Sequence, residues 1–143
     1  PRSRGLGDVY KRQKWERELA TDNTRREAQA VQDAAETLHE NFVKRAFQTD
    51  SICQLATASP HPVLVCGDFN SLPSSYTYHR LSESLKDGFK TGGHGYMYTY
   101  RYGKRMLRID YAFHSPELEC TDYYSPNLDL CSDHNPVIFT VKY

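Results

Sequence analysis

Three short polar segments in the second half of the chain contain the residue types that metal-assisted cleavage of a phosphate ester requires. They read Gly-Asp-Phe-Asn at 67–70, Arg-Ile-Asp-Tyr at 108–111 and Ser-Asp-His-Asn-Pro-Val at 132–137. Carboxylates bind hard divalent cations, while amide and imidazole groups can hydrogen-bond phosphate oxygens. Each segment lies at or beside the end of an expected strand, so a fold that aligns these strand ends would create one site.

The first segment offers an acid and an amide on one face of the chain. Asp68 and Asn70 are two residues apart, and alternate residues of extended backbone share a face. The amide can donate a hydrogen bond to a phosphate oxygen without changing the charge of the site. The alternative is an Asx turn, because both side chains readily bond their own backbone. The apolar run that ends at Gly67 favours the functional interpretation.

The second and third segments supply a carboxylate and a histidine that could act together. Asp110 lies within an apolar strand, where it is either a solvent-facing edge residue or a carboxylate that accepts a hydrogen bond from a histidine ring. Asp133 and His134 are neighbours that point opposite ways on extended backbone, so they suit different tasks. Asp133 would serve a cation and His134 a substrate phosphate; the alternative is a solvated pair at a strand start.

Basic and aromatic side chains surround these segments. A basic cluster around Gly103 could attract a phosphate, with a solvated hairpin as the default interpretation; its members are Arg101, Lys104, Arg105 and Arg108. From this cluster we predict that Arg108 binds substrate. The tyrosines at 96, 98 and 100 alternate along an expected strand and either pack or face the substrate. Surface or structural roles are expected for the other histidines, and among them His94, in a glycine-rich loop, comes nearest to a candidate for ligand contact.

The elements that must position these residues can be read from periodicity and turn residues. Thr24 with Glu27 has capping-box spacing, and the apolar period predicts a helix over 24–58, with a kink or break because it would span about 50 Å. Ser59-Pro60 ends it. We expect a buried central strand at 63–66, a helix capped by Ser74 or Ser75, a loop at 90–95, paired strands at 96–100 and 106–113, and strands at 118–124 and 136–143. This order predicts a mixed α/β or α+β layout.

Composition limits the class of protein. Eighteen basic residues balance eighteen acidic ones, so the net charge does not indicate a nucleic-acid partner, and eleven tyrosines argue against disorder. The four cysteines match no zinc framework, and reduced, mostly buried thiols are expected. The sequence shows no signal peptide and no apolar run long enough to cross a membrane, and localisation stays unknown. Residues 1–14 are expected to be a non-native or disordered tail, and residues 15–143 one portion of a domain.

Taken together, the three segments resemble the carboxyl-terminal half of the endonuclease/exonuclease/phosphatase superfamily, over about residues 28–143. The resemblance implies part of a DNase I-like four-layer α/β-sandwich with a mixed, mostly antiparallel sheet and a long N-terminal helix. It also implies a phosphoester hydrolase, phosphodiesterase or nuclease-like, that uses Mg²⁺ or Mn²⁺. The substrate class stays open between nucleic acid, phospholipid and a small phosphate ester, and no tight protein partner is implied.

The same resemblance implies a role for each residue of the three segments. Asp68 would position or deprotonate the attacking water, or assist the leaving group, and would also contribute to the metal site. Asn70 would hold the scissile phosphate, and Asp110 would orient His134, which would contact the phosphate. Asp133 would bind the metal or lie beside it.

The chain departs from the family's pattern in its first half. Members carry an asparagine and a metal-binding glutamate early in the chain, and no segment here matches them. We therefore expect a truncated domain that lacks its N-terminal half and part of the metal site, with little activity alone. The alternative is a non-catalytic binding or scaffold domain that retains the fold, and a nucleic-acid-binding module is a third option that the zero net charge weakens.

Overall fold

The computed structural model describes residues 4–102, 107–128 and 131–143, with side chains from residue 11 onward. In chain order the elements are α1 (Arg4–Ala58), β1 (Leu64–Asp68), α2 (Tyr76–Ser82), β2 (Lys86–Asp87), α3 (Gly88–Gly92), β3 (Asp110–His114), β4 (Glu119–Tyr124) and β5 (Ile138–Lys142). All pairs between these strands are antiparallel. The prediction of helices with a mostly antiparallel sheet is therefore confirmed.

Helix α1 differs from the prediction at its start and agrees at its end. It begins at Arg4 and is continuous to Ala58, so the expected break is absent from this helix. That residues 1–14 are a non-native or disordered tail stays a prediction. Thr24 does not cap the helix, because the Thr24 hydroxyl donates to the Ala20 carbonyl at 2.9 Å. Good helix formers and ion pairs four residues apart, such as Arg12 with Glu16, favour helix in this early stretch. The helix ends at Ala58, as Ser59-Pro60 predicted.

The chain divides into two compact units, residues 1–44 and residues 45–143. The first is entirely helical within its described part, and each of its described side chains is exposed. The regularly spaced apolar side chains of this helix are therefore not buried within that unit; Val31, for example, is 71% exposed. No helix in the described part of the chain is long and apolar enough to cross a membrane.

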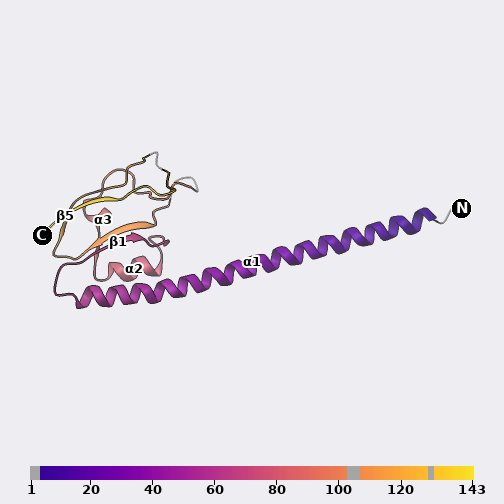
Figure 1. Cartoon of the computed structure of the whole chain (residues 1–143), viewed down its shortest axis with the longest axis horizontal. Helices are drawn as coiled ribbons and strands as arrows, with labels where there is room; N and C mark the ends of the chain where they lie inside the picture. The colour runs from indigo at the N-terminus through magenta and orange to yellow at the C-terminus, as the bar shows by residue number, and fades with distance from the viewer. Residues whose placement is uncertain (1–3, 103–106, 129–130) are drawn as a thin grey trace. The chain divides into compact units, whose positions relative to one another are not determined.

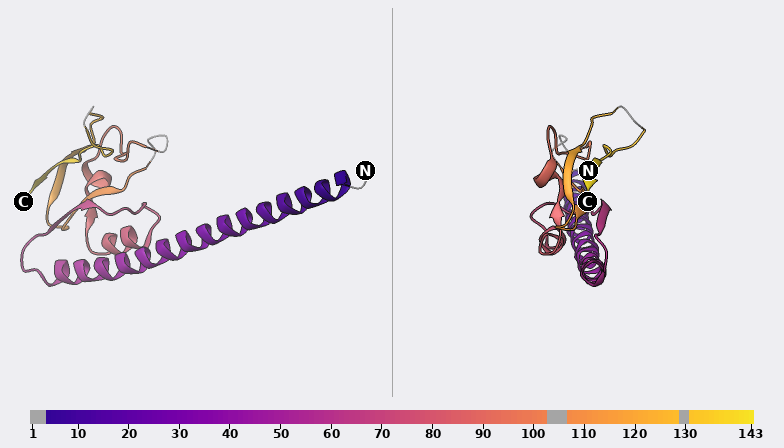
Figure 2. Two further views of the ribbon diagram at one scale, coloured as in Figure 1. Left: turned by 45° about the vertical axis from the view of Figure 1, so that its right-hand side comes forward. Right: turned by 90° about the vertical axis from the view of Figure 1, so that its left-hand side faces the viewer.

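The second unit contains three layers, which Figures 1 and 2 show around β1 and β3. The three-stranded sheet β1-β3-β2 lies between α2, with the end of α1, on one face and the two-stranded sheet β4-β5 on the other. Because side chains alternate along a strand, β3 contributes to both cores. Tyr111 and Phe113 pack with Cys53, Tyr78, Leu81 and Leu85, whereas Ala112 packs with Cys120 and Tyr123.

The buried central strand is β3, and the prediction that assigned this position to 63–66 was wrong. Strand β1 pairs with β3 alone among the described residues, so it lies at the sheet edge. Leu64 is 47% exposed, whereas β3 is buried from Tyr111 to His114. An apolar run indicates a strand, but it does not show how many neighbours that strand has.

The remaining elements agree in part with those predicted from the sequence. Ser75 caps α2 by accepting from the Tyr78 N–H, as predicted. The expected loop at 90–95 begins instead with α3, which Asp87 caps. Residues 96–100 form no strand, although Tyr100 bridges both Leu107 and His134; the expected turn at Gly103 lies outside the described residues. Strands β4 and β5 match the predicted strands at 118–124 and 136–143.

The four cysteines are free in the structure. Cys53 and Cys120 are buried, as expected for structural thiols, and burial raises the pKa of each. Cys66 and Cys131 are exposed, so the expectation of mostly buried thiols holds for half of the set.

Candidate active site

The register of β1 and β3 places two carboxylates opposite each other. Asp68 is the last residue of β1, Asp110 is the first residue of β3, and the two are paired across the ladder. The Phe69 N–H extends this pairing by donating to the Ile109 carbonyl at 2.9 Å. Directly opposed residues of an antiparallel pair have their side chains on the same face. The sheet therefore brings Asp68 and Asp110 together, although 42 residues separate them in sequence.

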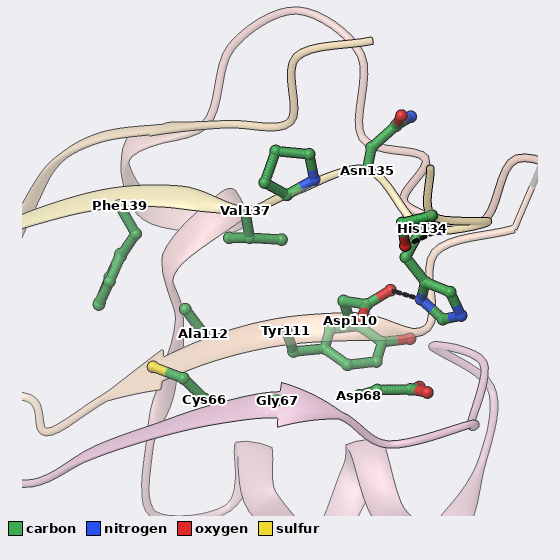
Figure 3. A pocket seen from close by; sticks show the side chains of 12 residues that line it. Cys66, Gly67, Asp68, Asp110, Tyr111, Ala112, His134, Asn135, Val137 and Phe139 are labelled. Atoms are coloured by element: carbon green, nitrogen blue, oxygen red, sulfur yellow. Dashed lines mark hydrogen bonds and ion pairs between the residues drawn. The ribbon is translucent and has the colours of Figure 1, made fainter. Parts of the chain in front are cut away.

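His134 joins these carboxylates from the segment before β5. Its Nδ1 lies 2.9 Å from Asp110 Oδ2, and one potential ligand atom from each of Asp68, Asp110 and His134 lies within 4.8 Å of the others. Figure 3 shows the three side chains converging at the ends of β1 and β3. The predicted convergence of these three residues is therefore found in the structure.

The environment of His134 sets its tautomer and its charge. Burial lowers the pKa of His134, but the hydrogen bond and negative charge of Asp110 outweigh this effect, and the charges of Asp68 and Asp133 add to it. The pKa of His134 is therefore raised above its usual value. With Nδ1 facing Asp110, the Nδ1 N–H donates a hydrogen bond to the carboxylate, and Nε2 remains available for a second partner.

These residues form the polar end of a cavity of about 500 Å³. Its opposite end is apolar and is lined by Cys66, Ala112, Val137 and Phe139. Asn135 also lines the cavity, but its side chain points away from Asp110 in Figure 3. A cavity that places two carboxylates and an imidazole beside an apolar wall can bind a charged group and a less polar substituent together.

Asn70 adopts the turn that the sequence left open as the alternative. Its N–H donates to Asp68 Oδ1 at 2.8 Å and its side-chain amide donates to Asp68 Oδ2 at 3.0 Å. Its φ of 45° is left-handed, a conformation that asparagine tolerates better than most residues. Asn70 thus fixes Asp68, and it lines a neighbouring cavity of about 400 Å³, with Arg45 and Gln48, rather than the first cavity.

The structure does not bring Asp133 into the three-residue cluster. Asp133 is exposed, and it neither lines the cavity nor belongs to the group that could hold a metal ion. Its charge acts on His134 at longer range, and its carbonyl accepts from the Arg101 N–H at 2.8 Å. The predicted role of Asp133 at a cation stays a prediction.

Arg108 was expected to bind substrate, and the structure corrects this expectation. Its side chain is 4% exposed and forms a two-point ion pair with Asp87, with Nη1 3.2 Å from Oδ1. The guanidinium carbon also lies 4.6 Å from the centre of the Tyr111 ring. Arg108 does not line the cavity, because the strand start turns it towards the core. A basic residue between Leu107 and Ile109 is better explained as a buried partner than as a surface cation.

Sequence reasoning missed Thr99, which fixes the geometry of the site. Thr99 is fully buried, and its hydroxyl accepts hydrogen bonds from the N–H groups of Ile109 and Asp110, each at 3.1 Å. Its carbonyl accepts from the Asn135 N–H at 2.7 Å. One residue therefore ties the start of β3, with Asp110, to the segment that carries His134. The only signal in the sequence is that Thr99 is a small polar residue between Tyr98 and Tyr100. On extended backbone its side chain would point to the face opposite the two tyrosines.

His94 forms a second histidine–carboxylate pair outside this site. Its Nε2 lies 2.7 Å from Asp122 Oδ1 and its ring stacks on Tyr124 at 5.5 Å. The His94 side chain is 65% exposed, and His94 does not line the cavity with Asp68. The position of His94 therefore agrees with the expected surface or structural role and gives no support to a ligand contact.

The residues of the cluster fit a divalent metal ion. Mg²⁺ is commonly bound through one or two carboxylates, with water and substrate phosphate completing its shell. Asp68 and Asp110 supply two such carboxylates from the β1–β3 ladder, and a ring nitrogen of His134 lies within 4.8 Å of a carboxylate oxygen of each. Which divalent ion binds is not determined by this donor set, because Mn²⁺ accepts the same ligands.

Comparison with known proteins identifies the family. Residues 13–134 match the model of the Endonuclease/Exonuclease/phosphatase family, which is most of the chain. The chain therefore belongs to this family, as the three sequence segments predicted. A search of curated proteins found no match.

Solved structures place the chain in the fold of this family. An endonuclease/exonuclease/phosphatase from Bacteroides vulgatus is similar with a TM-score of 0.61 and 26% identity, over 68% of this chain and 43% of that protein. A conserved protein of unknown function from Enterococcus faecalis has a TM-score of 0.62 at 19% identity, over 68% and 44%. A mannosyl-6-phosphatase from Bacteroides thetaiotaomicron has a TM-score of 0.52 at 23% identity, over 68% and 44%. The predicted fold class is confirmed, and this chain spans less than half the length of these proteins.

Proposed function

We propose that this chain supplies the phosphate-facing part of a divalent-metal-dependent phosphoester hydrolase, phosphodiesterase or nuclease-like in its reaction. The observation that carries the proposal is the cluster of Asp68, Asp110 and His134, whose potential ligand atoms lie within 4.8 Å of one another at the end of a cavity. Membership of the Endonuclease/Exonuclease/phosphatase family supports the same reaction class.

Each side chain has a task that follows from its contacts. In the imidazolium form, which its raised pKa favours, His134 donates from Nε2 to a phosphate oxygen, while Asp110 accepts from the Nδ1 N–H and thereby orients the ring. Asp68 orients the attacking water, and its own orientation is fixed by two hydrogen bonds from Asn70. Asp68 and Asp110 would hold the metal ion, which when bound neutralises negative charge on the phosphate oxygens. Positioning and electrostatic stabilisation then account for most of the catalysis of an in-line attack by water.

The alternative is a binding or scaffold domain that keeps the fold without turnover. Such a domain has no need for a carboxylate that orients a histidine at 2.9 Å on the lining of a cavity. The retention of Asp68, Asn70, Asp110 and His134 together therefore favours the hydrolase.

Hydrolysis of bis-p-nitrophenyl phosphate with Mg²⁺ tests the proposal. The chain alone is expected to turn over little, because no early segment of its sequence matches the family's metal-binding glutamate. We therefore include a chimera in which residues 45–143 replace the equivalent part of the Bacteroides vulgatus protein, which is 26% identical. The proposal predicts chelator-sensitive turnover by the chimera that is lost in His134→Ala. A folded chimera without turnover, or one that His134→Ala leaves unchanged, contradicts it.

A further inference from the structure

The hydroxyl of Tyr111 joins the two segments that carry the carboxylates of the site. It lies 2.7 Å from the Arg108 carbonyl oxygen and 2.8 Å from the Ser71 carbonyl oxygen. Arg108 precedes Asp110 by two residues, and Ser71 follows Asp68 by three. A hydroxyl has one proton to donate, so the two carbonyls share it as acceptors. Tyr111 therefore connects the start of β3 with the turn that follows β1.

The surroundings of this hydroxyl keep it as a donor. Tyr111 is 2% exposed, and burial raises the pKa of its hydroxyl above the usual value. The group is therefore protonated at neutral pH and donates its hydrogen bond throughout that range. Ser71 is also buried, so its carbonyl would have no ready access to water if this donor were removed.

The turn from Asp68 to Ser71 is held by Tyr111 at two points. The Phe69 ring packs edge-on against the Tyr111 ring, with centroids 5.8 Å apart, and the Tyr111 hydroxyl bonds the Ser71 carbonyl. Between these points, Asn70 has a left-handed φ of 45° and donates two hydrogen bonds to Asp68. A left-handed residue other than glycine costs free energy and persists where the surrounding structure fixes it. The contacts on both sides of Asn70 supply that restraint.

We propose that Tyr111 is a positioning residue for Asp68, and that it acts through the turn at Asn70 rather than as a ligand of the metal ion. Its hydroxyl fixes Ser71, the restrained turn keeps Asn70 left-handed, and Asn70 holds both oxygens of Asp68. This inference rests on the proposed function, which assigns Asp68 to the metal ion and the attacking water. Groups that orient a metal ligand alter metal affinity without touching the metal.

Tyr78 provides a matched control in the same core cluster. It is 3% exposed, and its ring centroid lies 5.3 Å from that of Tyr111. Its hydroxyl donates to Asp87 Oδ2 at 2.7 Å, so it serves the buried ion pair and not the turn at Asn70. Tyr78→Phe and Tyr111→Phe each remove one buried, hydrogen-bonded hydroxyl and retain the ring.

Mn²⁺ binding to the full chain, followed by the electron paramagnetic resonance signal of the free ion, separates positioning from stability. Tyr111→Phe is expected to raise the dissociation constant of Mn²⁺ about tenfold, the lower end of the range for loss of a group that orients a metal ligand. Tyr78→Phe should leave the dissociation constant unchanged. Both variants should unfold at lower urea concentration than the unmodified chain, because each leaves buried acceptors without a donor.

The same measurement in the Asn70→Ala background tests whether Tyr111 acts through the turn. Asn70→Ala removes the amide that holds Asp68, so Tyr111→Phe should then weaken Mn²⁺ binding little further. Losses of Mn²⁺ affinity that multiply in the double variant would show that Tyr111 acts by another path, and they would overturn the assignment.

The remaining outcomes separate this inference from the proposed function. Unchanged Mn²⁺ affinity in Tyr111→Phe, or an equal loss in Tyr78→Phe, overturns the positioning role and leaves the proposed function standing. Failure of the unmodified chain to bind Mn²⁺ saturably contradicts the metal site itself. If Tyr111→Phe does not fold in the isolated chain, the two variants are compared in the chimera at saturating Mg²⁺. There kcat should fall without a change in KM in Tyr111→Phe alone, and an unchanged kcat overturns the inference.

Discussion

Two ion pairs each take one residue from the segment at the start of β3, and they differ in burial and in access to a cavity. Arg108 and Asp87 form a buried ion pair, with side chains 4% and 1% exposed. His134 and Asp110 form a pair in which the side chains are 25% and 17% exposed and border a cavity. Arg108 and Asp110 are only two residues apart, yet one belongs to the core and the other to the site.

The difference between the pairs is how completely their hydrogen-bonding capacity is used. Both oxygens of Asp87 accept from Arg108, and they accept further bonds from the Tyr78 hydroxyl and the Phe89 N–H. In the other pair, Asp110 engages one nitrogen of His134 and the second nitrogen stays available. The Asp87 carboxylate is fully engaged and buried, although Arg108 Nε has no hydrogen-bond partner among the described residues, so this pair is closed to ligands and costly to break. The His134–Asp110 pair borders a cavity and can bind a ligand.

The largest effect expected from this comparison is on catalysis. In the hydrolysis assay with the chimera, His134→Ala is expected to lower kcat/KM by about 10²–10³-fold, the range for loss of one positioned hydrogen-bond donor to charge on the reacting group. His94→Ala is the matched control, because His94 also pairs with a carboxylate at 2.7 Å but lies outside the cavity. A similar loss of kcat/KM in both variants would contradict a specific role of His134 in catalysis.

The buried pair should control stability instead. Arg108→Ala leaves Asp87 buried without its cationic partner, so the free energy of unfolding should fall by about 3–5 kcal/mol in urea denaturation. Arg26→Ala removes an exposed partner of Asp22 and should change the stability by less than about 0.5 kcal/mol. A loss below about 1 kcal/mol for Arg108→Ala would argue that water compensates Asp87 in the folded protein.

Thr99 links the two regions and should show an intermediate effect. Thr99→Val leaves the N–H groups of Ile109 and Asp110 without their acceptor, and the expected loss of stability is about 1–3 kcal/mol. Thr99→Ser retains the hydroxyl and is expected to recover most of it. If Thr99→Ser loses stability in chemical denaturation and Thr99→Val does not, the methyl group and not the hydrogen bonds carries the role of Thr99.

The smallest effect concerns the charge of His134 in the metal-free chain. Burial lowers the pKa of His134, but the hydrogen bond and charge of Asp110 raise it by more than burial lowers it. An NMR titration should therefore place the pKa of His134 above the usual value of about 6.5. Because the folded-state pKa is the higher one, the pair's contribution to stability is complete below about pH 6.5 and is lost as the pH rises through the folded-state pKa. Asp110→Asn should return the titration towards the usual value. An unshifted titration in the unmodified chain would contradict the recorded pairing.

The sequence predicted the convergence of Asp68, Asp110 and His134 better than it predicted the framework around them. Asp68, Asp110 and His134 were found because polar residues at strand ends carry a chemical signature that does not depend on neighbouring strands. Arg108 was misplaced because a basic residue in an apolar strand gives no indication of which face it takes. The edge position of β1 and the brace at Thr99 depend on pairing between distant segments, and a single sequence does not record such pairing.

The central claim is that Asp68, Asp110 and His134 form one site for a divalent ion, and Mn²⁺ titration of the isotope-labelled chain tests it directly. Paramagnetic broadening in NMR spectra should saturate, centre on the amides of these three residues, and disappear in Asp68→Ala. Broadening that does not saturate, that spreads over the exposed acidic residues of α1, or that persists in Asp68→Ala would contradict the account.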